Sequence, residues 1–159
     1  GCKIVKIWKI PPVIKVYEAL GAIADGRVHL YNDYAEVFSS DKHKKYTVIF
    51  NLPKKIIAAN DNGSFWQKYL GYPAIAVLIL KNIIPYDAHV AESLKDIPWK
   101  EWNDEFHQDY AKTLERVHRE LKKQGIETSR VIKAIENVME YLHKTPYLMP
   151  EKLQRPPSS

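Results

Sequence analysis

Apolar and polar positions alternate in short runs over the first sixty residues of the chain. Residues 3–10 alternate lysine with apolar side chains at period two, which predicts a strand with one wet face. Residues 12–26 carry an apolar stripe at helical spacing that ends at Gly26, which predicts a helix. Further β-type runs, separated by turn residues, predict four more short strands: 27–32, 34–40, 45–51 and 54–59.

Helical spacing replaces the β-type pattern after residue 60. Residues 64–70 predict a short helix that Asn62 or Ser64 caps and Gly71 ends. Pro73 suits the first turn of the next helix, where its missing N–H is not needed. Residues 74–80 are apolar on every side, so that helix is expected to be central and buried.

Three more helices are predicted downstream, followed by a proline-rich tail. The first is a short helix capped by Asp87, and the second is a long helix from Pro98 to about Gln124. Thr128 or Ser129 is expected to cap the last helix, which reaches about His143. The predicted fold class is α+β, with a small mixed or antiparallel sheet, a hairpin–helix unit, and a helical second half that contains an αα-hairpin. The expected units are 1–83, 84–145 and the tail 146–159.

Composition limits the class of protein. Of 159 residues, 45% are hydrophobic and 11% aromatic, which is enough for a core. The single cysteine excludes an internal disulfide and a cysteine-built zinc site, so a cytoplasmic location is expected. The longest apolar run is too short to span a bilayer, and no membrane role is predicted. Richness in lysine, glutamate and isoleucine would suit a thermophile.

Positive charge is concentrated in the first half. The net charge is +5, and residues 1–83 hold twelve Lys/Arg against six Asp/Glu, whereas residues 84–159 hold twelve against thirteen. A basic half of this kind permits a polyanionic partner or gives a lysine-rich, soluble surface.

Roughly residues 13–82 resemble the SWIM zinc-finger family, and residues 44–80 carry its motif positions. The segment Tyr46–Val48 matches the lead-in Tyr-x-Val of that family. Ile57 and Ala59 stand where the family has Cys-x-Cys, and Gly71 and Pro73 stand where it has Cys-x-His. These four side chains cannot bind zinc, so the resemblance implies a metal-free finger with no cofactor, held together by packing. It also implies nucleic-acid binding, or protein contacts in a DNA-processing assembly.

Basic loops with nearby aromatic side chains are the candidate nucleic-acid site. Lysines at two predicted hairpin turns, with a short aromatic helix, could contact phosphates and stack bases without base specificity. The candidate residues are Lys42, His43, Lys44, Lys45, Lys54, Lys55, Trp66 and Lys68.

Two other classes of function stay open. A protein-interaction subunit would use the neutral helical half, with Trp99 and Trp102 near a helix start. An enzyme of unknown type would have a deep pocket in which acids gather with some of four histidines: His29, His89, His107 and His118. No catalytic residue, metal ligand or small-molecule substrate is identified.

Two patterns in the predicted helices could also carry chemistry. His107 and His118 would share one face of the long helix, but eleven residues place them roughly 16 Å apart, too far for a two-metal centre. Arg130, Lys133 and Asn137 would share an exposed face after a glycine turn, as in a helix-turn-helix, although an αα-hairpin is the commoner structure.

Overall fold

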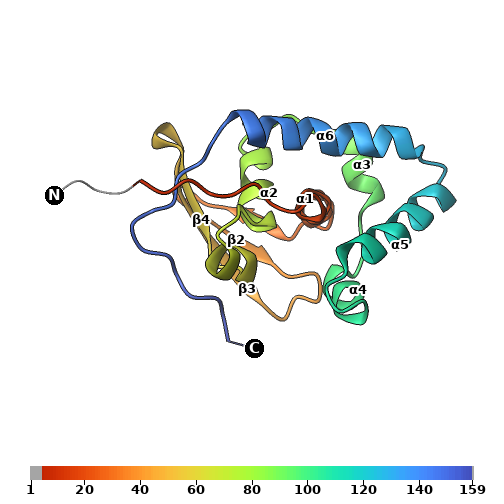
Figure 1. The fold of residues 1–159 in the computed structure, drawn as a ribbon, viewed down its shortest axis with the longest axis horizontal. Helices are drawn as coiled ribbons and strands as arrows, with labels where there is room; N and C mark the ends of the chain where they lie inside the picture. The colour runs from red at the N-terminus through yellow and green to blue at the C-terminus, as the bar shows by residue number, and fades with distance from the viewer. Residues whose placement is uncertain (1–4, 159) are drawn as a thin grey trace.

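Four strands form one antiparallel sheet whose order follows the chain, β1–β2–β3–β4 (Figure 1). The computed structural model describes residues 5–158. Val37 of β2 lies opposite Tyr46, and Val48 of β3 lies opposite Ala59, so the buried side chains of adjacent strands share one face. The strands are β1 (Val28–Leu30), β2 (Tyr34–Phe38), β3 (Lys45–Asn51) and β4 (Ile56–Ala59). The four strands predicted after residue 26 are confirmed.

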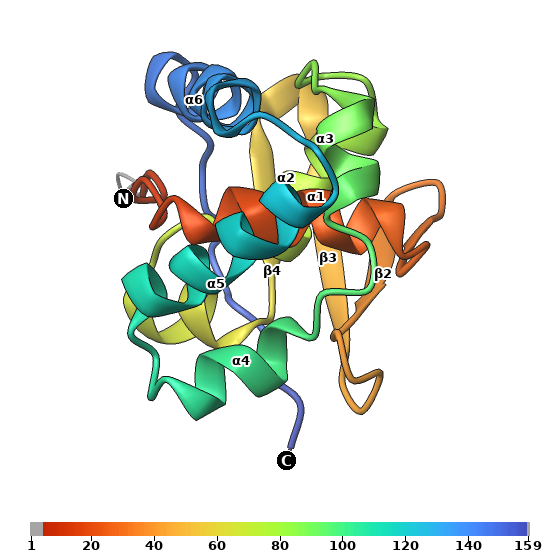
Figure 2. The ribbon, with the colours of Figure 1, turned by 90° about the vertical axis from the view of Figure 1, so that its right-hand side faces the viewer.

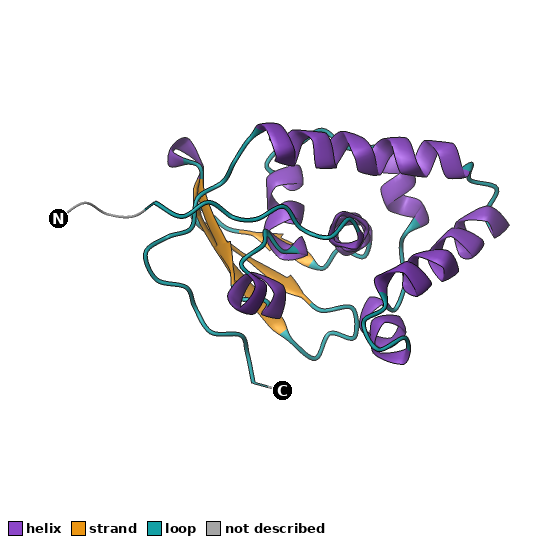
Figure 3. Ribbon diagram, in the orientation of Figure 1, coloured by secondary structure: helices purple, strands orange, loops and turns teal. Residues whose placement is uncertain are grey.

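Helices cover the sheet and make up the second half of the chain (Figures 2 and 3). They are α1 (Ile14–Ala24), α2 (Tyr72–Leu80), α3 (Ala88–Ser93), α4 (Trp99–Glu105), α5 (Tyr110–Lys123) and α6 (Thr128–Lys144), with single turns η1 (Leu52–Lys54) and η2 (Gly63–Gln67). The predicted α+β class with a helical second half is confirmed. No helix within residues 5–158 is long and apolar enough to cross a bilayer.

The core lies between the sheet and the layer formed by α1 and α2. Helix α2 contacts α1 on one side and β1, β3 and β4 on the other. Its residues 73–79 are all buried, which confirms the prediction of a central helix. Helix α6 packs across α1 and α3, so the buried apolar side chains of both halves form one continuous cluster.

The long helix predicted from Pro98 to Gln124 is broken, and that prediction is wrong. Helix α4 ends at Glu105, and α5 begins at Tyr110. His107 and Gln108 between them have positive φ, and the Asp109 carboxylate accepts a hydrogen bond from the backbone N–H of Lys112. Such a cap begins a new helix because it satisfies a free N–H of its first turn. His107 and His118 therefore do not share one helix.

The strand predicted at 3–10 is absent from the described part of that segment, residues 5–10; Lys3 and Ile4 lie outside the described residues. The tail occupies the edge of β4 instead, since Leu148 bridges Ile56 on one side and Ile7 on the other. The N-terminal segment is fixed beyond the tail, where the Trp8 indole N–H donates to the carbonyl oxygen of Ile57 at 2.7 Å.

Helix boundaries differ from the predictions at two places. Helix α6 begins at Thr128, and its N-cap residue is Glu127, whose side chain makes no capping hydrogen bond. Neither Thr128 nor Ser129 caps the helix. The short helix after residue 62 is a single π-type turn that ends at Lys68 in the left-handed conformation, before Gly71. The predicted cap of α3 by Asp87 and the place of Pro73 in the first turn of α2 are confirmed.

Candidate ligand-binding cleft

A polar cleft of about 380 Å³ opens between α1, α4, the β2–β3 loop and the loop that precedes η2. This volume falls within the range of small-molecule sites in proteins. The chain lines it with an unusual number of charged and phenolic side chains, among them Lys15, Glu18, Arg27, Lys44, Tyr46, Asp61, Tyr69, Tyr72, Asn103 and Tyr110.

A buried ion pair lies on one wall of the cleft. Lys15 and Glu18 are one turn apart on α1, and the Lys15 ammonium is 2.9 Å from Glu18 Oε2. The Asn103 amide of α4 donates to Glu18 Oε1 at 2.8 Å, while its own Oδ1 is buried with no hydrogen-bond partner among residues 5–158. Burial alone would lower the pKa of Lys15, but the Glu18 carboxylate, with smaller effects of Tyr69 and Tyr110, raises it on balance. Lys15 is therefore a fixed cation.

Asp61 is a second buried acid beside the same cleft. It is 6% exposed, and its carboxylate accepts hydrogen bonds from the Ser64 hydroxyl at 2.6 Å and the Ser64 backbone N–H at 3.3 Å. The absence of a side chain at Gly71 makes room for it, since a Cβ there would lie 2.7 Å from Asp61 Cγ. Burial raises the pKa of Asp61, although the Ser64 hydrogen bonds and Lys15 act in the opposite direction.

Three tyrosines bring neutral donors to the cleft. Burial raises the pKa of Tyr46 and of Tyr69 to about 12, and it raises the pKa of Tyr72 as well. The Tyr46 and Tyr72 rings meet edge to face at 6.2 Å. Within residues 5–158, the hydrogen bonds made by tyrosine hydroxyls all involve other tyrosines. The hydroxyls of these three have no hydrogen-bond partner there. They remain protonated at neutral pH and free to donate to a ligand.

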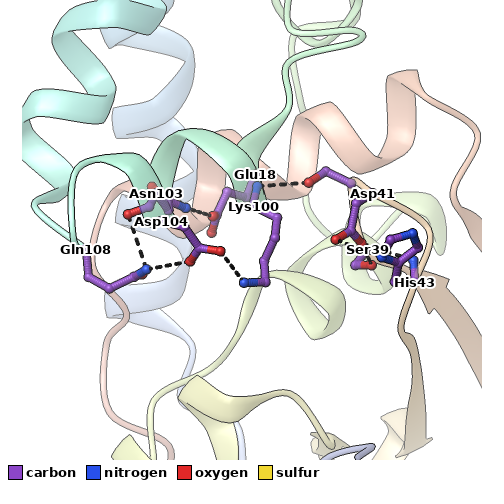
Figure 4. Close-up of polar contacts among 9 residues, drawn as sticks. Glu18, Ser39, Asp41, His43, Lys100, Asn103, Asp104 and Gln108 are labelled. Carbon is purple, nitrogen blue, oxygen red and sulfur yellow. Dashed lines mark hydrogen bonds and ion pairs between the residues drawn. The ribbon is translucent and has the colours of Figure 1, made fainter. Parts of the chain in front are cut away.

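The β2–β3 loop is joined to α4 at the rim of the cleft (Figure 4). Ser40 Oγ accepts a hydrogen bond from the backbone N–H of Lys100 at 2.9 Å, in the first turn of a helix whose own N-cap residue, Pro98, offers no side-chain cap. Ser39 is fixed by the Asp41 carboxylate, to which its hydroxyl donates at 2.7 Å. The loop and the helical half thus hold one another in place around the cleft.

The sequence-predicted nucleic-acid residues fall in three separate places. Residues 42–45 lie in the β2–β3 loop and at the start of β3, whereas Lys54 and Lys55 follow the end of β3. A strand of seven residues separates these groups by about 23 Å. Trp66 and Lys68 lie on η2 and directly after it. Among the eight predicted residues, Lys44 lines the cleft, and Lys45 pairs with Glu36 at 3.1 Å.

Other residues that the sequence marked as functional candidates contact the rest of the chain or lie outside the cleft. The described structure brings none of the histidines to the cleft lining, and His118 bonds the Tyr17 hydroxyl at 2.8 Å. Trp99 and Trp102 are buried, so they cannot form the exposed surface that the sequence suggested. Arg130, proposed for a DNA groove, binds Asp87 through two nitrogens. Residues 5–158 contain no cluster of His, Cys, Asp and Glu that could hold a metal.

Sequence reasoning missed the cleft. Lys15 and Glu18 interrupt an otherwise apolar helix, and Glu18 directly follows Tyr17 of the predicted apolar stripe. Charged residues on a buried helix are unusual and could have marked the site. Asp61 sits in the segment Asn-Asp-Asn-Gly-Ser, where it is indistinguishable from turn residues.

Comparison with known proteins identifies the family of the chain. No curated protein and no solved structure matches the chain. A family model described as "Uncharacterised conserved protein UCP014422" matches residues 8–147, which include the whole lining of the cleft. The chain therefore belongs to that family.

Proposed function

We propose that the protein binds a small polar molecule in the cleft and that Asp61 exchanges a proton with it. The observation that carries this proposal is the gathering of Lys15, Glu18 and Asp61 around one open space. Burying ionised groups opposes folding unless they are well paired, and groups with shifted pKa values concentrate at functional sites.

The arrangement supports acid–base chemistry. Asp61, with its raised pKa, holds a proton more tightly than an exposed carboxyl does, and no cation of residues 5–158 is in direct contact with it. A carboxyl of this kind serves as a general acid or base when a ligand lies within hydrogen-bond reach. Lys15 supplies a fixed positive charge, and the tyrosines supply neutral donors. The cleft therefore suits a ligand that carries both hydrogen-bond acceptors and an exchangeable proton.

A thermal-shift screen with small polar compounds tests this proposal. Compounds that bind the cleft should raise the melting temperature of the wild type and raise it much less in D61N, which keeps the shape of the side chain but cannot exchange a proton. D33N is the matched control, because Asp33 is exposed in the β1–β2 turn. Equal shifts in D61N and wild type, or no compound that shifts the wild type, would overturn the proposal.

A second candidate function is contact with a nucleic-acid backbone, in line with the SWIM resemblance and without bound zinc. The observation that favours it is the exposure of Lys42 and His43 on the β2–β3 loop, beside the cleft. Such contacts weaken steeply with salt because counterions are released. In anisotropy titrations with single- and double-stranded DNA and RNA, K42A/K44A should lose binding, whereas K54A/K55A at the other end of the sheet should not. Binding that neither pair weakens would contradict this location.

A further inference from the structure

Arg27 forms a fixed cationic corner at the sheet side of the cleft. It is 3% exposed, its Nε donates to Asp25 Oδ2 at 3.0 Å, and its Nη1 donates to the carbonyl oxygen of Phe38 at 2.6 Å. Its backbone is also fixed, because the N–H of Phe38 donates to the Arg27 carbonyl oxygen at 3.0 Å. Nη2 has no hydrogen-bond partner in the described chain, although Arg27 lines the cleft. An immobilised guanidinium with donors to spare is prepared for an acceptor that the protein does not supply.

More donors surround this corner. The Arg27 guanidinium is close enough to Tyr72 for its positive charge to oppose the rise in the pKa of that phenol that burial causes. The Tyr72 ring in turn contacts the Tyr46 ring. Lys44 reaches the cleft from the β2–β3 loop, where its N–H donates to Ser39 Oγ at 3.1 Å, and its ammonium has no ion-pair partner within residues 5–158. The turn between α1 and β1, the start of β3, the start of α2 and the β2–β3 loop thus each contribute a donor.

The Glu18 and Asp61 carboxylates of the cleft have partners of their own. Glu18 Oε1 and Oε2 are engaged by Asn103 and Lys15, and the Asp61 carboxylate is held by Ser64. None of these carboxylates forms an ion pair with Arg27, whose own counterion is Asp25. The donor-rich corner around Arg27 therefore lies next to the acid–base side of the cleft, since the Asp61 carboxylate, in addition to burial, also acts on Tyr46 and Tyr72 and raises the pKa of both phenols.

We infer that the ligand carries an oxyanion, a carboxylate or a phosphate, which binds at Arg27, Tyr46, Tyr72 and Lys44. This inference rests on the proposed function, that the cleft binds a small molecule. Charge-assisted bonds from a guanidinium and from phenols to an oxyanion are short and strong, and a guanidinium orients the anion as well as attracting it. The substrate class is then a small molecule with an oxyanion at one end and a proton-exchanging group, an amine or a hydroxyl, at the other.

Nuclear magnetic resonance titration of the ¹⁵N-labelled full chain tests the corner directly. The probes are sodium phosphate and sodium acetate, with sodium chloride at matched ionic strength as the reference. We expect one oxyanion, and not chloride, to shift the backbone amides of residues 27, 44, 46 and 72. A response to phosphate alone identifies a phosphate ligand, and a response to acetate alone identifies a carboxylate. Shifts that chloride reproduces, or no shifts, would overturn the inference.

Variants separate this inference from the proposed function. Y46F/Y72F removes two hydroxyls without removing a ring, so it should fold and bind the responding oxyanion about tenfold or more weakly, since hydrogen bonds to a charged group are strong. Y31F, which removes a hydroxyl on the exposed ring stacked on Tyr34, should leave the affinity unchanged. Unchanged affinity in Y46F/Y72F overturns the inference. If D61N alters no compound's binding while Y46F/Y72F weakens the oxyanion, the proton-exchange role fails and the oxyanion corner stands.

Discussion

The Lys15 ammonium and the Glu18 carboxylate lie 2.9 Å apart on α1, with side chains only 13% and 5% exposed. Asn103 of α4 binds the same carboxylate, so the pair connects the first half of the chain to the helical half. An ion pair at this depth loses most of its hydration, and it is stable only while each charge keeps its partner.

Substitution of one partner of this pair should therefore be costly. We expect E18Q to lower the free energy of unfolding by about 3 kcal/mol, because it leaves the Lys15 ammonium buried without a counterion. Urea denaturation measures the change. E105Q is the matched control, since Glu105 pairs with Arg116 at 2.9 Å but is 55% exposed, and it should cost about 1 kcal/mol or less.

The double variant K15M/E18Q gives the second test of the same pair. Removing both charges relieves the buried ammonium, so the double variant should be more stable than E18Q alone. If K15M/E18Q is less stable than E18Q, the Lys15 ammonium does not destabilise the E18Q variant. That result would contradict the claim that E18Q leaves a buried charge without a counterion.

Gly71 and Asp61 should be energetically coupled. A methyl group at Gly71 would lie 2.7 Å from Asp61 Cγ, so G71A must displace the carboxylate or shift α2, at a cost of about 1–3 kcal/mol. In a D61A background the obstruction is gone, and G71A should be nearly neutral. A double-mutant cycle measured by urea denaturation gives the coupling. Additive effects would show that the carboxylate does not lie against Gly71.

Much of the fold could be predicted from local sequence, and the reasons differ from element to element. The strands between residues 28 and 59 and the buried helix α2 were predicted because their apolar periods and turn residues agree. The break at His107 and Gln108 was not predicted, because the residues on either side continue a helical pattern. Only the cap by Asp109 starts a new helix there. The tail's place beside β4 depends on contacts between residues over ninety positions apart, which no local pattern encodes.

The candidate site was less predictable than the fold. Basic loops are visible in a sequence, and the predicted strand 45–51 already separates two of them, but which lysine reaches the cleft depends on the packed fold. The cleft depends on side chains from α1, the β2–β3 loop, α2 and α4, and apart from the two charges on α1 none of them stands out in the sequence. What makes them unusual is burial, and burial of a particular lysine or aspartate is a property of the packed chain.

Trp8 should contribute strongly to stability through its indole N–H. It is 5% exposed and donates to the Ile57 carbonyl oxygen of β4. W8F removes the donor and part of the buried ring, so we expect a loss of about 2–3 kcal/mol in urea denaturation. W66F is the matched control, because Trp66 is 61% exposed, and its effect should stay within about 0.5 kcal/mol. Equal effects of the two substitutions would contradict the packing of the N-terminal segment against β4.

His118 should make stability depend on pH. Its imidazole bonds the Tyr17 hydroxyl at 2.8 Å, and burial lowers the pKa of His118 below its ordinary value of 6.5. Between the folded pKa and 6.5 the unfolded chain binds more protons, so this contribution is complete above pH 6.5 and is lost as the pH falls through the folded pKa. The slope cannot exceed about 1.4 kcal/mol per pH unit for one proton.

Comparison with H118Q isolates this effect, because glutamine does not titrate and can still bond Tyr17. Asp61 contributes with the opposite sign: its raised pKa gives stability below the ordinary pKa of 3.8 that is lost as the pH rises through the folded pKa. The free energies of unfolding of wild type and H118Q, measured from pH 4 to 8 and subtracted, cancel the Asp61 effect. We expect the difference to change only below about pH 6.5. A pH-independent difference would mean that His118 has the same proton affinity in the folded and unfolded chains.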